Sequence, residues 1–291
     1  MFQFFANIFG FVLNFINDFV GNYGLAIILF TVLIKLIMLP LSIKQQKTMK
    51  KSSKIQEQVK VLQFKYKNDP EKLNREMMDL YKKENMSPFS GCLSSIVQFI
   101  LLISIFYMVR FPLTYMERID KTQIDAYIQQ MKDDGMAVSQ AYSEIDIVRE
   151  IDYLKEKFPD NEELNKINLN MNFCGLDLSK IPQQNLGDWT VYIIPILYII
   201  STFISMRITT SMQNNMKKKK DDVIDITENK EEEKSEMEDA MAQSNKMMSW
   251  MMPIMSVSIS LVAPLGLALY WLVNNILMIM ERLVLDKFIK D

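Results

Sequence analysis

A run of apolar residues from Tyr23 to Ile43, broken by a single charge at Lys35, most constrains what this chain can fold into. A helix that crosses a bilayer needs about 20 mainly apolar residues, so the run is long enough for one span. The next charge, Lys44, is nine positions further on, which corresponds to roughly 13 Å along a helix. Burying an ionisable group at that depth costs about 2.5–3.5 kcal/mol, so such groups normally face a bundle interior or a hydrated cavity. Lys35 is therefore a candidate functional residue, and the alternative is a lysine that snorkels to the interface and has no further role.

The composition excludes a single soluble domain and gives no sign of catalysis. Of the 291 residues, 49% are hydrophobic, and they gather in several long runs, as is typical of a polytopic membrane protein. The sequence contains no histidine, no Gly-rich phosphate loop, no nucleophile elbow and no metal-ligand spacing. We therefore expect no catalytic residues, no metal site and no cofactor, and we do not expect an enzyme.

The apolar runs predict an all-α polytopic membrane protein with five transmembrane helices. The expected spans are residues 23–43, 88–111, 189–206, 247–262 and 265–284. Lysines follow the first span closely, so the positive-inside rule places residues 44–87 in the cytosol and the N-terminus outside. The charged linker 207–246 and the tail 285–291 are then cytosolic as well.

Residues 1–22 are expected to form an amphipathic helix at the membrane interface. Phenylalanines recur along this segment, and Asn7, Asn14, Asn17 and Asp18 lie between them. The interrupting polar residues favour a helix that lies on the membrane, although a span is the alternative.

Residues 44–87 predict an antiparallel helical hairpin. Apolar residues at helical spacing mark both arms, with Asp69 and Pro70 between them as the cap and the first residue of the second helix. The residues expected to dock a cytosolic partner are Ile55, Val59, Leu62, Leu73 and Met77. The alternative is a solvated connector with a charged face.

Residues 112–188 form an acidic insertion that is expected outside the cytosol. From Leu113 to Asp188 the sequence has 15 Asp and Glu against eight Lys and Arg. Apolar residues at helical spacing predict short amphipathic helices around residues 124–131 and 145–154.

The second expected span carries polar residues on one face. Ser94 and Gln98 are separated by four positions, so they share a side of the helix. Such residues either hydrogen-bond a neighbouring helix or line a hydrophilic groove.

Taken in order, several short motifs resemble the Oxa family of membrane protein insertases in its five-span, YidC-type bacterial form. These motifs are Leu39-Pro40-Leu41, the lysine-rich hairpin, Gly91-Cys92-Leu93 with Gln98, Phe173-Cys174-Gly175-Leu176-Asp177-Leu178, Met252-Pro253-Ile254-Met255 and the run from Pro264 to Trp271. Each motif alone is weak, and the resemblance lies in the ordered set.

The resemblance implies five helices around a hydrophilic groove that is open to the cytosol and to lipid and holds a positive charge. The implied client-binding residues are Lys35, Thr31, Ser94, Gln98, Ser205, Tyr270 and Trp271. Lys35 stands where the family usually has arginine, which replaces a planar fork of donors by a point charge.

The function implied is that of an insertase and chaperone that moves client transmembrane segments from the cytosol into the bilayer of the bacterial cell membrane. The expected partners are client membrane proteins with short translocated tails, the lipid bilayer, the Sec translocon, the signal recognition particle pathway and the ribosome, with no specific nucleic acid. Two alternatives remain open at this point: a membrane scaffold that docks cytosolic complexes through the hairpin, and a small-solute carrier that uses Lys35 as a counter-charge.

Overall fold

The computed structural model describes residues 2–66, 69–84, 90–221 and 257–288. The long helices are α1 (Phe2–Val20), α2 (Tyr23–Lys65), α3 (Pro70–Lys83), α4 (Ser90–Arg110), α9 (Ile193–Asp221) and α11 (Leu265–Phe288). Four helices in this part of the chain are long and apolar enough to cross a membrane: they contain Phe2–Val20, Tyr23–Thr48, Trp189–Ser211 and Leu265–Leu285. The expectation of an all-α polytopic membrane protein is confirmed.

The remaining two expected spans are seen in part. Helix α4 carries a shorter apolar segment, Ile96–Arg110. The span expected at residues 247–262 lies outside the described residues except for its last turns, where residues 257–262 are helical.

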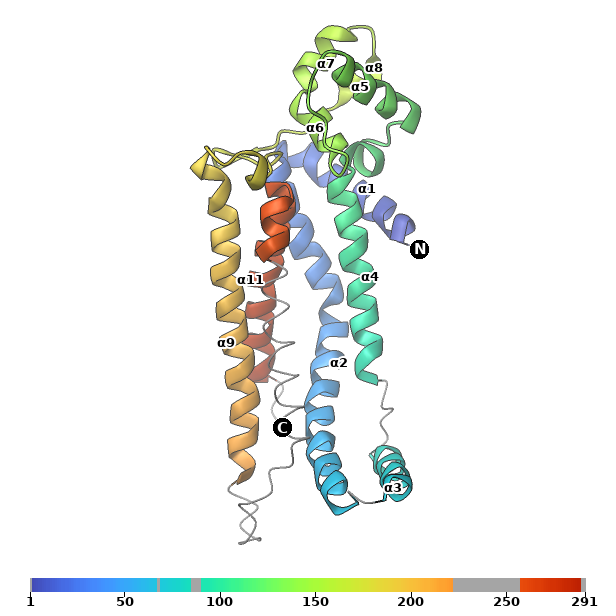
Figure 1. Ribbon diagram of the computed structural model, residues 1–291, viewed down its shortest axis with the longest axis vertical. Helices are drawn as coiled ribbons and strands as arrows, with labels where there is room; N and C mark the ends of the chain where they lie inside the picture. The colour runs from blue at the N-terminus through green and yellow to red at the C-terminus, as the bar shows by residue number, and fades with distance from the viewer. Residues whose placement is uncertain (1, 67–68, 85–89, 222–256, 289–291) are drawn as a thin grey trace.

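Helices α2, α4, α9 and α11 run side by side (Figure 1). Helix α11 packs against both α9 and α2, and α4 packs against α1, α2 and α11. Helix α3 folds back on one end of α2, and the opposite end of the bundle is covered by residues 112–188, which we call the cap.

Helix α1 is both amphipathic and long enough to span. One side packs on α2, α4 and the short helix η1 (Leu113–Glu117), and it buries Ala6, Phe9 and Leu13. The other side exposes large apolar residues: Phe4, Ile8, Phe11, Phe15 and Phe19. Whether this helix lies on the membrane or crosses it stays a prediction.

Helix α2 joins the first expected span to the first arm of the hairpin without a break. The side chain of Asn22 accepts a hydrogen bond from the backbone N–H of Leu25 at 3.1 Å and so caps the helix. The helix then continues through Pro40 to Lys65. The change from apolar to basic composition at residue 44 therefore marks a change of surroundings and not a helix end.

The turn of the hairpin follows the sequence prediction. The Asp69 side chain accepts a hydrogen bond from the backbone N–H of Lys72 at 3.0 Å, and Pro70 occupies the first turn of α3. At the other end of α3, the Lys51 ammonium donates to the Glu84 carbonyl, which ties the two arms together.

The cap is a small domain of short helices. They are η1, α5 (Lys121–Asp133), α6 (Ser143–Arg149), α7 (Ile151–Lys157) and α8 (Glu162–Lys166). Ile124, Tyr127, Ile145 and Leu154 are buried in its core, which confirms the helical spacing seen in the sequence.

A short hairpin and the residues after it attach the cap to the bundle. The hairpin comprises β1 (Asn172–Phe173) and β2 (Leu176–Asp177), and Cys174 and Gly175 turn between them with positive φ, as a two-residue turn requires. The segment that follows, with η2 (Pro182–Gln184) and η3 (Trp189–Tyr192), leads into α9.

The cap satisfies the backbone groups at the start of the two central helices. The backbone N–H of Tyr23, the first residue of α2, donates to the Asn170 carbonyl at 3.0 Å. The N–H groups of Leu265 and Gly266, at the start of α11, donate to the carbonyls of Lys180 and Leu178 at 2.9 Å each. Helix N-termini otherwise leave such donors unpaired, so the cap fixes where α2 and α11 begin.

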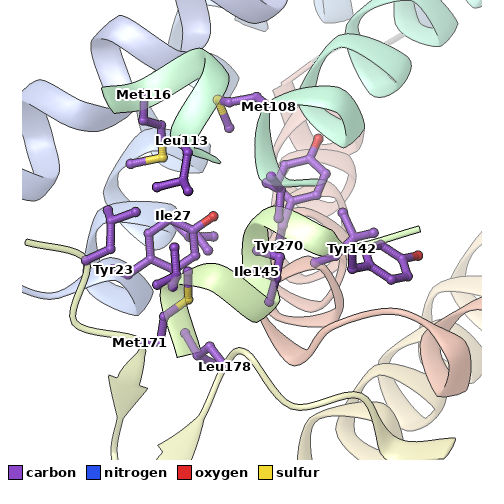
Figure 2. Packing of buried hydrophobic residues seen from close by; sticks show 14 of the residues in the cluster. Tyr23, Ile27, Met108, Leu113, Met116, Tyr142, Ile145, Met171, Leu178 and Tyr270 are labelled. Atoms are coloured by element: carbon purple, nitrogen blue, oxygen red, sulfur yellow. The ribbon is translucent and has the colours of Figure 1, made fainter. Parts of the chain in front are cut away.

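Figure 2 shows the apolar side of this attachment. Tyr23 and Ile27 of α2 belong to one buried cluster with Met171 and Leu178 of the cap. Both central helices are therefore held firmly at the cap end.

Candidate functional site

An ion pair joins the two central helices inside the membrane-spanning part of the chain. The Nζ of Lys35 on α2 lies 3.6 Å from Oε2 of Glu281 on α11, and the side chains are 20% and 14% exposed. Both helices start at the cap and run in the same direction (Figure 1). At a rise of 1.5 Å per residue, Lys35 lies about 18 Å from the start of its helix and Glu281 about 24 Å from the start of its own.

The packing around this pair loosens with distance from the cap. On α2, Tyr23, Ala26, Ile27, Phe30 and Thr31 are buried. Leu25 and Leu29 on the opposite side of this stretch are exposed, but no residue from 32 to 48 is buried.

Helix α11 shows the same gradient. Its buried apolar residues are concentrated between Leu265 and Leu272, whereas Ile276, Met280 and Leu283 are exposed. Lys35 and Glu281 therefore lie in the less tightly packed half of both helices.

Thr31 lies one turn before Lys35 on the same side of α2, and its hydroxyl bonds within the helix. Its hydroxyl donates to the carbonyl of Ile27 at 2.6 Å, and the residue is 2% exposed. Thr31 is therefore the last buried residue of the densely packed half of α2, one turn before Lys35.

A buried hydrogen-bond network links α11 to α9. The side-chain amide of Asn275 donates to the hydroxyls of Ser201 at 2.9 Å and Thr202 at 3.3 Å. Two turns further along, the Arg282 guanidinium donates to the Thr209 hydroxyl. Helix α11 thus presents Asn275 and Arg282 to α9 and Glu281 to α2.

Tyr270 and Trp271 lie on α11 in the packed half, and Ser205 lies on α9. Tyr270 is buried, and the rings of Trp271 and Tyr198 are 6.2 Å apart at an angle of 34°. Ser205 is buried, and its carbonyl accepts the hydroxyl of Thr209 at 2.8 Å. Trp271 therefore faces α9, and the two aromatic residues lie about 15 Å along α11 from Glu281.

The expected groove residues of the second span are placed only in part. Gln98 is exposed on α4. Ser94 belongs to α4, but its side chain lies outside the described residues, as does most of the span expected at 247–262.

The family comparison agrees with the resemblance in the sequence. The family model described as 60Kd inner membrane protein matches residues 15–291, which is nearly the whole chain. The chain belongs to the 60Kd inner membrane protein family. The relationship to YidC-type insertases predicted from the motifs is thereby confirmed.

Curated members of the 60Kd inner membrane protein family resemble the chain over a limited region. Proteins named membrane protein insertase YidC from Francisella tularensis subsp. novicida (strain U112), subsp. holarctica (strain LVS) and subsp. tularensis (strain SCHU S4) are each 46% identical over 109 residues. The matched region is 38% of this chain and 20% of each relative, so the chain covers about a fifth of their length.

In this family member, one residue expected to dock a partner is buried. Ile55 is 2% exposed and lies one turn after Lys51, which bonds to the end of α3. The docking role of the five hairpin residues stays a prediction. Val59, Leu62, Leu73 and Met77 are half-buried, and Val61 and Met78 are exposed among the side chains of the hairpin that the structure describes.

The sequence analysis missed Glu281 and Arg282 altogether. Charged residues commonly flank the ends of membrane helices, so two charges near the end of the last expected span do not stand out. One signal was available, because the apolar residues Leu283, Val284 and Leu285 continue after them. Charges followed by another apolar turn indicate groups that need a partner at depth.

The described part of this family member has no cluster of three or more His, Cys, Asp or Glu that is suited to a metal ion. Its distinctive chemistry is instead the pairing of charges between helices.

Proposed function

We propose that this chain is a membrane protein insertase and chaperone that helps client transmembrane segments enter and fold in the lipid bilayer. The supporting observation is membership of the 60Kd inner membrane protein family over residues 15–291. Relatives that match part of the chain carry the name membrane protein insertase.

The proposed working surface is a hydrophilic groove beside α2 and α11. Lys35 supplies an ammonium within the span, and its 20% exposure leaves it accessible to a second partner. The loosening of packing along both helices supports a site that opens away from the cap. Because the cap covers the other end of the bundle, the groove is closed on the cap side.

Such a groove lowers the free-energy barrier to client insertion, and it does so in three ways. Water around Lys35 shortens the distance over which a polar tail must be dehydrated. The ammonium attracts a carboxylate in the tail of the client, and partial hydration keeps this attraction weak enough for release. The hydrophobic segment of the client then moves sideways into lipid, where its own transfer free energy drives insertion.

This process breaks and forms no covalent bond, so we propose that the protein is not an enzyme and has no cofactor. Its residues attract the tail of the client, exclude lipid from the groove and keep water around Lys35. The proposed client-contacting residues remain Lys35, Thr31, Ser94, Gln98, Ser205, Tyr270 and Trp271.

The proposed orientation puts the N-terminus outside and the C-terminus in the cytosol of a bacterial cell. The lysines of the hairpin then lie on the cytosolic side, and the acidic cap lies outside. The hairpin is the proposed contact for cytosolic partners such as the signal recognition particle pathway and the ribosome, and the Sec translocon is a proposed partner in the membrane.

The test is site-specific photo-crosslinking to a stalled single-span client with an acidic tail. A photoreactive amino acid replaces Trp271, and the matched control replaces Trp189, which is 73% exposed at the cap end of α9. The proposal predicts client adducts at position 271 that exceed those at position 189. Adducts confined to position 189 would contradict it.

A further inference from the structure

The Lys35–Glu281 ion pair raises a question about the groove, because the ammonium that should attract a client already has a carboxylate partner. Within the described residues, Glu281 is the acidic side chain within 4.0 Å of the Lys35 ammonium. The ammonium is therefore not a free positive charge in the resting protein.

The geometry of the pair is that of a contact that can be exchanged. Hydrogen bonds between an ammonium and a carboxylate are normally about 2.7–2.9 Å long, whereas this N···O distance is 3.6 Å. Both side chains keep some exposure, at 20% and 14%. Separating a loose and partly hydrated ion pair costs less free energy than separating a short and fully buried one.

A Glu281 carboxylate displaced from Lys35 would still have a second cation close to it. Arg282 is its neighbour in the chain, and the two charges lie within electrostatic range. The bond of Arg282 to Thr209 uses one of its N–H groups, and a guanidinium has five N–H donors in all. The carboxylate can therefore leave Lys35 without becoming an isolated charge in the membrane.

We propose that Glu281 is a built-in competitor for the acidic residue of the client, and that it sets how much negative charge a client needs in order to bind. At rest it neutralises Lys35, and a carboxylate in the tail of the client replaces it during insertion. Neutral tails do not displace it. This inference rests on the proposed insertase function and makes Glu281 the specificity-determining residue of that site.

Two physical consequences distinguish this role from a purely structural one. If Glu281 competes, neutralising it must favour acidic clients over neutral ones, since only acidic clients gain from a free ammonium. If the pair only holds α2 against α11, its loss must reduce the insertion of both clients by the same factor.

The experiment uses the full chain in liposomes and two single-span clients that differ only in an acidic tail with Asp or a neutral tail with Asn. Insertion is compared for the wild type, Glu281→Gln and the control Glu163→Gln, which removes an exposed carboxylate on α8 in the cap. The measured quantity is the ratio of acidic to neutral client inserted.

We expect Glu281→Gln to raise this ratio about 5- to 30-fold, the factor that corresponds to a charge pair worth about 1–2 kcal/mol, and Glu163→Gln to leave it unchanged. An unchanged or lower ratio in Glu281→Gln would overturn the competitor role. Failure of the wild type to insert either client above empty liposomes would instead overturn the proposed function, so the two failures are distinguishable.

A charge-reversed double variant, Lys35→Glu with Glu281→Lys, tests whether the change in Glu281→Gln comes from the lost charge pair and not from misfolding. It restores a pair of opposite charges between the same two positions. We expect its ratio to return to the wild-type value, and a ratio as high as that of Glu281→Gln would also contradict the competitor role.

Discussion

The pairing of Lys35 with Glu281 predicts a measurable coupling between the two side chains in the free energy of unfolding. Two unit charges 3.6 Å apart attract by about 4.6 kcal/mol at an effective dielectric constant of 20 and by about 1.2 kcal/mol in bulk water. The side chains are 20% and 14% exposed, so the attraction between the two charges lies between these limits. The free energy cost of dehydrating both charges is then subtracted from it. We therefore expect a coupling free energy of about 1–2 kcal/mol.

The assay is a double-mutant cycle with Lys35→Met, Glu281→Gln and the double variant. Unfolding by a denaturing detergent from mixed micelles measures the free energy of unfolding of each form. Each single variant leaves one charge without its partner, so the double variant should be more stable than the sum of the single losses predicts.

A matched control is available in the cap. Glu162 and Lys166 on α8 lie 3.7 Å apart, almost the same distance, but their side chains are 87% and 74% exposed. Their cycle should give a coupling within the error of the measurement, because water screens exposed pairs. Losses at Lys35 and Glu281 that add to within about 0.5 kcal/mol would refute the reasoning, because such side chains do not interact.

Two further predictions concern the contact between α1 and η1. A Cβ at Gly10 would lie 2.1 Å from the backbone oxygen of Tyr115. Gly10→Ala should therefore lower the free energy of unfolding by about 1–3 kcal/mol through overpacking. The control Gly187→Ala, whose Cβ would meet nothing within 4 Å, should show no such loss in the same assay. Burial, and then the charge of Asp18, raise the pKa of Glu117 from 4.5 to about 7; the folded state therefore holds this proton more tightly, and stability should fall as the pH rises from 4.5 through 7.

The pH prediction is checked by comparing unfolding at several pH values in the wild type and in Asp18→Asn. Removing the Asp18 charge should lower the pKa of Glu117 and flatten the profile, while burial, the larger cause, keeps the pKa above its ordinary value. Identical profiles would rule out any influence of Asp18, and equal stability of Gly10→Ala and Gly187→Ala would rule out close packing of α1.

Features that depend on local chemistry could be predicted from the sequence. The Asp69–Pro70 start of α3 follows from the preference of Asp for a cap and of Pro for the first turn, and the structure places both there. The depth of Lys35 follows from counting apolar residues, and the structure places it within α2 in the membrane-spanning part of the chain.

Features that depend on which helices are neighbours could not be predicted. The pairing of Lys35 with Glu281 joins residues from opposite ends of the chain, and no local pattern encodes that distance. Helical spacing shows that a face of the hairpin is apolar without showing how much of each side chain is covered, and the burial of Ile55 could not be predicted from it. The bonds of Asn275 to Ser201 and Thr202 likewise depend on the packing of α11 on α9.

The central claim is that the ammonium of Lys35 drives the insertion of acidic clients. The most direct test is the insertion of a small single-span client with an acidic tail into liposomes that contain the wild type, Lys35→Arg or Lys35→Ala. The account predicts insertion by the wild type that persists with arginine, which keeps the charge, and drops with alanine, which removes it. Equal insertion by all three forms would contradict the claim that this charge drives the process.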